Sequence, residues 1–390
     1  MPRLAPRMSR IVGSATIAMN NLVAQKKAAG IDVISFSVGE PDFETPPHIS
    51  QAAKEALDAG KTKYTPGPGI PELRRAIAGT AQEEQRIPCE AKNILVAPAK
   101  QAVLYSLLAT VDHGDDVLLP DPAWVSYEPM VRWAHANPVP VPLEPDQGFR
   151  MTPEAVAQRI TPRSKAIVLN SPSNPTGGIN TAADVRGIVE LAIDHDLWII
   201  SDEIYRHLQY EGEALSPAAL PGGFERTITV DGLSKSFAMT GWRMGWAIAP
   251  NPAWGALDRL QSHSLTHITS FAQYGALAAL QGPQDSVAAM KAEFRARRDL
   301  IVAGLRALPG VTCPEPMGAF YVFPSFDKAK WGGLRDEDLA LALLDQANIA
   351  VTAGTSFGSR GQGHLRFSYA TGQERIRTGL ERLAAWQASR

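Results

Sequence analysis

A lysine lies at the end of an apolar, strand-like run, where an amine is not expected. Lys235 stands in Gly-Leu-Ser-Lys-Ser-Phe, directly after the run 227–230, and Arg243 follows eight positions later. Lysine is strongly hydrated and is rarely buried without a partner. Apolar neighbours and a nearby cation would lower the pKa of this amine, and a neutral amine can act as a nucleophile or carry a proton. The alternative is an ordinary lysine in a solvated loop.

Other strand-like runs are also followed by polar or aromatic side chains. The segments concerned are 97–101 (Ala-Pro-Ala-Lys-Gln), 120–124 (Pro-Asp-Pro-Ala-Trp), 170–177 (Asn-Ser-Pro-Ser-Asn-Pro-Thr-Gly) and 201–205 (Ser-Asp-Glu-Ile-Tyr). Ligands of open α/β sheets bind beyond the carboxyl ends of the strands, so we expect these segments to share one rim. Each of them alone could be a turn or a helix cap, but their joint placement favours a binding site.

The elements that would position these groups alternate through the middle of the chain. The strand-like runs are 93–96, 116–119, 166–169, 197–200, 227–230 and 246–249, with helix-like segments at 101–111, 127–136 and 182–195. Runs that are apolar on both faces are typical of strands buried in a parallel sheet. The pattern predicts an α/β fold, with a mostly parallel central sheet that carries helices on both faces.

The C-terminal part has a different pattern, in which a long charged helix at 284–308 precedes short strands and further helices. This indicates a smaller α+β domain packed on the first. We expect a large domain at 45–290 and a small domain formed by 1–44 and 291–390, on which an N-terminal helix packs. The basic run Arg295-Ala296-Arg297-Arg298 is interpreted as a solvated face of the long helix.

The composition excludes several classes of protein. The chain has 390 residues, of which 45% are hydrophobic and 20% charged, with a formal net charge of -2. This balance is typical of a globular protein. It does not indicate nucleic acid or an anionic membrane as a binding partner. Cys89 and Cys313 cannot form a disulfide framework and lack metal-ligand spacing, so we expect a cytoplasmic protein without a metal. We expect neither a signal peptide nor a membrane span.

Several longer strings resemble those of a known enzyme family. They are KTKYTPGPGIPELRRAIA at 61–78, NSPSNPTG at 170–177, SDEIY at 201–205 and SKSFAMTGWRMG at 234–245, extended by SVGEPDFETP at 37–46 and LRFSYA at 365–370. With them the sequence is similar to class I aminotransferases of the pyridoxal-phosphate fold type I family, especially the branch of the bacterial aspartate aminotransferases. The resemblance implies this fold, pyridoxal 5'-phosphate as cofactor, and a homodimer with shared active sites.

The resemblance also implies roles for residues at the strand ends. Lys235 would form a Schiff base with the cofactor and then move the substrate proton. Asp202 would pair with the pyridine nitrogen, while Asn174 and Tyr205 would bind the phenolate oxygen and Trp124 would stack on the ring. Taken singly, Asp202 could be a helix cap, Asn174 a turn residue and Trp124 a packing residue.

The phosphate of the cofactor needs helix N-terminal amides and cations. The residues that the resemblance assigns to the cofactor here are Ala99, Lys100, Gln101, Ser234, Arg243 and Tyr64, the last from the neighbouring subunit. The chain departs from its relatives at Pro98 and Ala99, which replace glycines, and at Gly232, which replaces a serine. The segment 266–270 also departs from the usual string. These departures put the details of phosphate binding in question.

The substrate residues implied by the resemblance include Arg366, which would clamp the α-carboxylate of an amino acid with help from the Gly39 amide. Trp124 and Asn174 would also face the substrate. Lys100 would reach a distal carboxylate, which favours an acidic substrate, or it could face water. The string Val12-Gly13-Ser14 replaces a Lys-Pro-Ser string of some relatives, which argues against a second basic contact and against prephenate.

The predicted function is therefore a ping-pong transfer of the amino group of an L-amino acid, most readily aspartate, to a 2-oxo acid such as 2-oxoglutarate. An aromatic, alanine or other neutral amino donor and a β-lyase reaction on the same cofactor remain open. A nicotinamide dehydrogenase is disfavoured, because Gly67-Pro68-Gly69 is only a fragment of the dinucleotide motif and no strand precedes it. A non-catalytic regulator is disfavoured by the complete catalytic set.

Overall fold

The computed structural model describes every residue except 1–2, 6–7, 10, 12 and 213. Its centre is a seven-stranded sheet in the order β2-β8-β7-β6-β5-β3-β4. The strands are β2 (Ile94–Val96), β3 (Asp116–Asp121), β4 (Asn137–Pro142), β5 (Ser164–Asn170), β6 (Trp198–Asp202), β7 (Thr227–Gly232) and β8 (Gly245–Ile248). β8 is antiparallel to β2 and β7, and the other neighbours pair in parallel. The predicted α/β fold with a mostly parallel sheet is confirmed.

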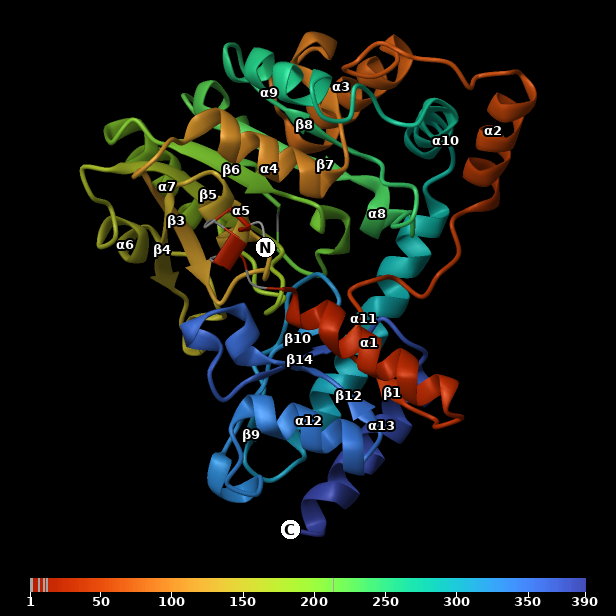
Figure 1. The fold of residues 1–390 in the computed structure, drawn as a ribbon, viewed down its shortest axis with the longest axis vertical. Helices are drawn as coiled ribbons and strands as arrows, with labels where there is room; N and C mark the ends of the chain where they lie inside the picture. The colour runs from red at the N-terminus through yellow and green to blue at the C-terminus, as the bar shows by residue number, and fades with distance from the viewer. Residues whose placement is uncertain (1–2, 6–7, 10, 12, 213) are drawn as a thin grey trace.

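Alternate residues of the central strands enter cores on opposite faces of the sheet. Val117 and Leu119 of β3 join the apolar cluster that includes residues of α4 and α5, whereas Leu118 joins the cluster that includes residues of α7. Because a strand projects successive side chains to opposite faces, both faces must be apolar when both are covered. This explains why these runs lack the alternation of a half-exposed strand. The helices on the two sides are visible in Figure 1.

The edge strand β4 was not among the predicted strands. It contains Pro138, Pro140 and Pro142 in alternating positions, and prolines argue against a strand inside a sheet because they have no N–H to donate. β4 pairs only with β3, so the prolines are tolerated at this edge.

The helices of this part of the molecule are α2 (Pro47–Asp58), α3 (Pro71–Gln85), α4 (Ala99–Thr110), α5 (Tyr127–Trp133), α6 (Pro153–Ala157), α7 (Ala182–Asp194), α8 (Leu233–Ser236), α9 (Ala253–Ser262) and α10 (Ser270–Gln281). Pro71 begins α3 and Pro47 begins α2, positions where the missing N–H of proline costs no helical hydrogen bond. No helix of the described residues is long and apolar enough to cross a membrane.

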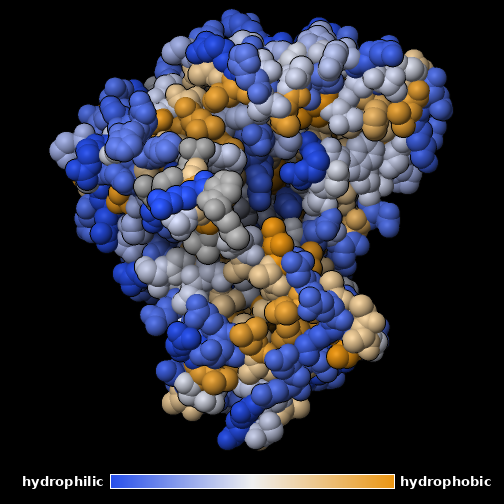
Figure 2. All heavy atoms as spheres, viewed as in Figure 1, coloured by the Kyte–Doolittle hydropathy of each residue, from blue (hydrophilic) through white to orange (hydrophobic). Residues whose placement is uncertain are grey.

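A second body, coloured red in its N-terminal part and cyan to blue in its C-terminal part in Figure 1, combines the two ends of the chain. Its helices are α1 (Ala15–Ala28), α11 (Asp285–Arg306), α12 (Asp336–Gln346) and α13 (Gln373–Ala388). Its strands are β1 (Ile34–Ser35), β9 (Val311–Thr312), β10 (Tyr321–Val322), β11 (Ser325–Phe326), β12 (Ile349–Ala350), β13 (Thr352–Ala353) and β14 (Leu365–Ser368). Met19 and Val23 of α1 pack into its apolar core, as expected for the N-terminal helix. Figure 2 shows further hydrophobic atoms around α1, where Ile17 and Leu22 are exposed.

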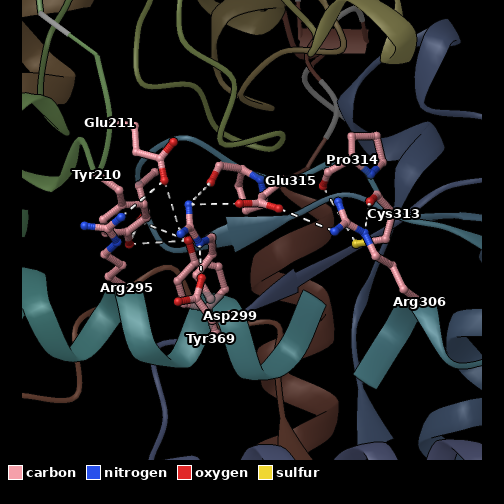
Figure 3. Close-up of polar contacts among 12 residues, drawn as sticks. Tyr210, Glu211, Arg295, Asp299, Arg306, Cys313, Pro314, Glu315 and Tyr369 are labelled. Carbon is pink, nitrogen blue, oxygen red and sulfur yellow. Dashed lines mark hydrogen bonds and ion pairs between the residues drawn. The ribbon is translucent and has the colours of Figure 1, made fainter. Parts of the chain in front are cut away.

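The long helix α11 corrects one interpretation of the sequence. Arg297 and Arg298 are 6% and 3% exposed, so the basic run is not simply a solvated face. Arg298 lies over the ring of Tyr210 and forms ion pairs with Glu211, Asp299 and Glu315. Figure 3 labels Tyr210, Glu211, Asp299 and Glu315 among the polar contacts around this part of α11. The carboxylates compensate for the burial of the guanidinium, and a helical pattern alone could not show them.

Candidate active site

The segments that follow β5, β6 and β7 meet at a cavity of about 340 Å³. Of the residues predicted for the site, those that line the cavity are Gly39, Ala99, Lys100, Trp124, Asn174, Asp202, Tyr205, Ser234, Lys235, Arg243 and Arg366. The two that do not line it are Tyr64 and Gln101. The structure therefore brings together groups from both bodies of the molecule, far apart in sequence.

Lys235 lies in the single turn of α8, which begins directly after β7. Its Nζ donates a hydrogen bond of 2.7 Å to the carbonyl oxygen of Gly39. The pKa of the amine is lowered to about 8, mainly by burial. The nearby Glu40 raises this pKa, whereas Arg243 lowers it further. About a tenth of the amine is therefore neutral at pH 7, and this neutral form is the one that a nucleophilic lysine requires.

Asp202 is the last residue of β6 and is buried. Its Oδ2 accepts a hydrogen bond of 2.7 Å from the hydroxyl of Tyr127, and its Oδ1 accepts one of 3.3 Å from the Ile204 amide. Burial raises the pKa of the carboxyl to about 6, although both hydrogen bonds oppose the shift. The group is ionised at neutral pH and has no cation bonded to it among the described residues, so it suits a cationic ligand.

Tyr205 of the sheet-containing body and Tyr321 of the second body contact each other at the wall of the cavity. Their hydroxyl oxygens lie 2.9 Å apart, and burial raises the pKa of both phenols. The Tyr321 hydroxyl also explains why residue 39 is a glycine, because a Cβ at Gly39 would lie 2.7 Å from that oxygen. The N-terminal segment can thus approach closely enough for its carbonyl to reach Lys235.

Arg366 of β14 is a buried guanidinium without a carboxylate partner in the described part of the chain. Its Nη1 donates to Asn174 Oδ1 at 3.0 Å and its Nη2 donates to the Ser37 carbonyl at 2.8 Å, whereas its Nε has no hydrogen-bond partner. The rings of Tyr321 and Phe357 lie 4.6 and 4.9 Å from its central carbon. A buried cation held only by neutral groups is suited to an anionic ligand, and a planar guanidinium to a carboxylate.

The N-terminus of α4 supplies free backbone donors to the same cavity. Within the residues that the structure describes, the amides of Ala99 and Lys100 have no hydrogen-bond acceptor, whereas the Gln101 amide already donates to the Pro98 carbonyl at 2.8 Å. The Lys100 amine lies 4.8 Å from the centre of the Trp124 ring. Two free amides at a helix start, together with a lysine, form a suitable site for an anion.

Arg243 lines the cavity from the loop between α8 and β8. It has a left-handed backbone with φ of 56°, and its Nη1 donates to the Thr240 carbonyl at 2.8 Å. A non-glycine residue in this region is strained, which is common where geometry serves a site. The arginine therefore adds a second cation near the free helix amides without a carboxylate to neutralise it.

The glycine that replaces a serine in this chain has a steric explanation. Gly232 pairs with Gly245 in the sheet, and a Cβ at Gly232 would lie 2.7 Å from the Gly245 Cα. A Cβ at Gly245 would in turn approach the Ala99 amide nitrogen to 2.9 Å. The two glycines therefore let β7, β8 and the start of α4 pack closely behind the cavity.

Tyr64 lies outside this cavity, with 88% of its surface exposed. Its ring packs edge-on against His267, whose Nδ1 lies 3.2 Å from Thr65 Oγ1, so the departing segment 266–270 supports the tyrosine. Residue Val12 of the substituted N-terminal string lies outside the described residues. A large exposed aromatic residue is typical of an interface, which is consistent with a role beyond its own chain.

Sequence reasoning missed Tyr127, Tyr321 and Ser37. Tyr127 bonds Asp202, Tyr321 bonds Tyr205, and the Ser37 carbonyl bonds Arg366. The sequence pattern predicted that Tyr127 lies on a helix, and Tyr321 belongs to an aromatic run that is typical of a buried core. Neither pattern indicates a residue of the site. A tyrosine in a buried run carries a hydroxyl that needs a partner, and this was the available signal.

Comparison with known proteins assigns the family. Residues 31–383 match the model of the family described as aminotransferase class I and II. An aspartate/prephenate aminotransferase of Cereibacter sphaeroides is 42% identical, with 100% of this chain and 99% of the relative covered. An aspartate aminotransferase of Geobacillus stearothermophilus is 41% identical over the whole of both chains. The chain therefore belongs to the class I and II aminotransferases, and it is a transaminase.

The fold agrees with this assignment. The solved structure of the Thermus thermophilus aspartate aminotransferase with maleate is 40% identical and superposes with a TM-score of 0.94, covering 99% of this chain and 100% of that one. The shared fold includes both bodies of the molecule, between which the cavity lies.

Proposed function

We propose that the protein transfers the amino group of L-aspartate to a 2-oxo acid such as 2-oxoglutarate by a ping-pong mechanism, with pyridoxal 5'-phosphate as cofactor. The observation that carries this proposal is one cavity in which a lysine of lowered pKa, a buried carboxylate and a buried unpaired arginine lie together. The names of the relatives, aspartate aminotransferases, support the same substrate.

The residues present fit this cofactor. The free amides at the start of α4, with Ser234 and Arg243, offer donors to a phosphate, and Asp202 offers an ionised carboxylate to a protonated ring nitrogen. Asn174 and Tyr205 offer hydrogen-bond donors to a ring oxygen, and Trp124 offers an aromatic face. When bound, pyridoxal phosphate supplies an electron sink that makes the α-proton of an amino acid removable.

The protein's own groups then have separable tasks. The Nζ of Lys235 would hold the cofactor covalently. When it is free and neutral, this amine would take the proton from the substrate α-carbon as a base and then give the proton up as an acid. Arg366 orients the α-carboxylate, and the Gly39 segment covers the site. Tyr127 keeps the Asp202 carboxylate fixed by its hydrogen bond of 2.7 Å.

Lys100 supports an acidic substrate. Its pKa is lowered by burial and by Arg243, and its amine faces the cavity over Trp124 without a carboxylate partner among the described residues. Ser14 and Thr16 at the start of α1 line the cavity as well. A carboxylate in the substrate side chain would meet these donors, whereas an aromatic or alanine side chain would leave them unsatisfied.

We further propose a cytoplasmic homodimer with shared active sites, divided into domains at 45–290 and at 1–44 with 291–390. The exposed Tyr64 supports the dimer, since it would reach the phosphate only in a second copy. The free, buried Cys89 and Cys313 are consistent with a reducing compartment.

The test is incubation of the cofactor-loaded enzyme with aspartate and 2-oxoglutarate. The proposal expects glutamate and oxaloacetate in equal amounts, and keto acid release from aspartate before the second substrate is added. A β-lyase needs a donor with a leaving group on Cβ, which aspartate lacks. Release of pyruvate, ammonia and sulfide from cysteine, with no glutamate formed from aspartate and 2-oxoglutarate, would instead indicate the β-lyase reaction. A panel of alanine, aspartate and phenylalanine as amino donors would settle the substrate, because an aspartate enzyme should show the highest kcat/KM with aspartate.

A further inference from the structure

Behind the cavity lies a buried ion pair that the proposed reaction does not use directly. Arg206 Nε donates to Asp231 Oδ2 at 2.6 Å, and the side chains are 9% and 1% exposed. Arg206 also donates through Nη1 to Glu84 Oε2 at 2.5 Å, at the end of α3. Replacing a buried ion pair by apolar residues is often neutral or stabilising, so stability alone is a weak reason for its presence.

Each member of the pair lies within four positions of a residue of the site along the chain. Arg206 begins the short 3₁₀ turn Arg206–Leu208, directly after Tyr205. Asp231 is the penultimate residue of β7, and its Oδ1 accepts a hydrogen bond of 2.7 Å from the Gly232 amide, where the chain turns into α8 and Lys235. The two oxygens of one carboxylate thus connect the turn after Tyr205 to the turn before Lys235.

The turn that carries Lys235 has little local support. α8 contains four residues, and its N-cap Gly232 has no side chain to cap it. A helix this short is not stable by itself, so its place must be set by contacts outside it. The Leu233 amide bonds the Met244 carbonyl at 3.2 Å, and the Asp231 carboxylate supplies the other anchor at the helix start.

We propose that Arg206 and Asp231 are a positioning pair, whose ion pair fixes the place of Lys235 relative to Tyr205 and shields Asp202 from the charge of Asp231. The inference rests on the proposed function, because positioning is defined by the transfer at Lys235. Neither residue lines the cavity, so neither is a catalytic residue in this scheme.

Other ionisable groups surround the ion pair of Arg206 and Asp231. Asp202 of β6 pairs with Val230 of β7, so Asp231 is the next residue along the neighbouring strand. Burial is the main cause of the raised pKa of Asp202 and of Glu203, and the charge of Asp231 raises both further. Glu203 accepts hydrogen bonds from Ser201, Ser216 and Gln85. Glu84 is the second partner of Arg206, and burial, Arg206 and Lys291 lower the pKa of His207. Arg206 is therefore the cation that balances Asp231 behind the cofactor-facing carboxylate.

The test compares Arg206→Met and Asp231→Asn with the wild-type holoenzyme. Both should lower kcat by about ten- to a hundredfold, since small misplacements of reacting groups have effects of this size, while KM changes less because Arg366 is untouched. The visible circular dichroism per bound cofactor should fall, because this signal reports how firmly the cofactor is oriented. Arg206→Lys, which retains the charge, should recover part of kcat.

A pH measurement separates the two single variants. The affinity of the apoprotein for pyridoxal phosphate should fall when Asp202 becomes protonated. In Arg206→Met the uncompensated charge of Asp231 should raise the pKa of Asp202, so the affinity should fall at a higher pH than in the wild type. In Asp231→Asn and in the double variant this charge is absent, so the affinity should not fall at a higher pH. A purely structural pair would not produce a pH shift in one variant and none in another when both lose the same ion pair. If Arg206→Met does not fold, the positioning role is still tested by kcat, because the double variant should lose kcat and Arg206→Lys should recover part of it.

The matched control is the ion pair of Arg150 with Asp184 at the start of α7, which does not line the cavity. Arg150→Met and Asp184→Asn should lower thermal stability and leave kcat, dichroism and the pH of cofactor binding unchanged. Equal kinetic losses in the control, or kcat within twofold of wild type in both test variants, would overturn the positioning role. A wild-type protein that neither binds pyridoxal phosphate covalently nor transaminates would overturn the proposed function instead.

Discussion

Two groups of buried or half-buried cations in this molecule differ in their partners. Along α11, Arg297 forms ion pairs with Asp42 and Glu293, and Arg298 with three carboxylates. At the cavity, Lys235 and Arg366 are bonded to neutral oxygen atoms instead, of Gly39, Asn174 and Ser37. Both regions lie where the two bodies meet, and both remove cations from water.

The difference separates structural cations from functional ones. A buried cation is costly unless an anion compensates it, and along α11 the protein supplies the anion itself. At the cavity the compensation is left to carbonyl oxygens and aromatic rings, so the site gains most when a carboxylate or phosphate arrives. We expect removal of a cavity cation to affect catalysis most, and removal of an α11 arginine to affect stability most.

The largest effect is expected for Lys235→Ala. It removes both the covalent attachment point and the proton carrier, so kcat should fall by at least about 10⁴-fold. Borohydride reduction followed by mass spectrometry should find cofactor fixed at residue 235 in the wild type and none there in the variant. A variant with normal turnover would contradict the assignment of Lys235.

Arg366→Met should have the next largest effect. Truncating one member of a buried charge-assisted contact costs about 2–5 kcal/mol, which is roughly thirty- to several thousandfold in kcat/KM for the amino acid and the keto acid alike. The cofactor should still bind. Because Arg366 has no carboxylate partner in the described chain, this variant should lose less stability in thermal unfolding than Arg298→Met.

Lys100→Met should change substrate preference more than overall activity. If its amine meets the distal carboxylate, kcat/KM for aspartate should fall by about ten- to a hundredfold, with little change for alanine, because only aspartate loses a charged contact. Steady-state kinetics with both amino donors check this. An equal loss with both donors would place Lys100 at the phosphate instead.

Attachment of the cofactor to the apoprotein should depend on pH through the Lys235 amine. Because the pKa is lowered to about 8, the amine is mostly protonated below that pH, and the rate should fall by about sixteenfold between pH 8 and pH 6.5. The measurement is the absorbance change after mixing. Glu40→Gln should move the midpoint to lower pH, and Arg243→Gln should move it to higher pH, since Glu40 raises and Arg243 lowers the Lys235 pKa. Shifts of the opposite sign would contradict this electrostatic account.

The smallest effect on catalysis is expected for Arg298→Met. It should leave kcat/KM within about twofold while the free energy of unfolding falls by roughly 1.5–3 kcal/mol, the range for hydrogen bonds to charged groups. Urea denaturation of the apoprotein checks the stability. A catalytic loss as large as that of Arg366→Met would erase the distinction between the two regions.

Much of the fold could be predicted from the sequence because its signals are local. The six strand-like runs all lie in the central sheet, and the long helix predicted at 284–308 is Asp285–Arg306. The edge strand β4 was not predicted, because its prolines are acceptable only in a strand that has no partner on one side. That condition depends on strand order, which local patterns do not contain.

Only part of the site could be predicted from the sequence, for the same reason. Strand ends and family strings led to Lys235, Asp202, Tyr205 and Asn174, which do line one cavity. The hydroxyl of Tyr321 reaches Tyr205 only because the two bodies pack together, across 116 positions of sequence. No spacing rule connects such a pair.

The sequence alone determined the class of the fold, the family and the kinds of chemical group available at the strand ends, because periodicity and short strings are local properties. The tertiary structure decided which cations keep a carboxylate of their own and which do not. Arg298 and Arg366 are both buried arginines, yet the packing around them gives one its anions and leaves the other to a ligand. The physical reason is that the charge state and affinity of a buried group depend on distances and desolvation, and only the folded chain sets these.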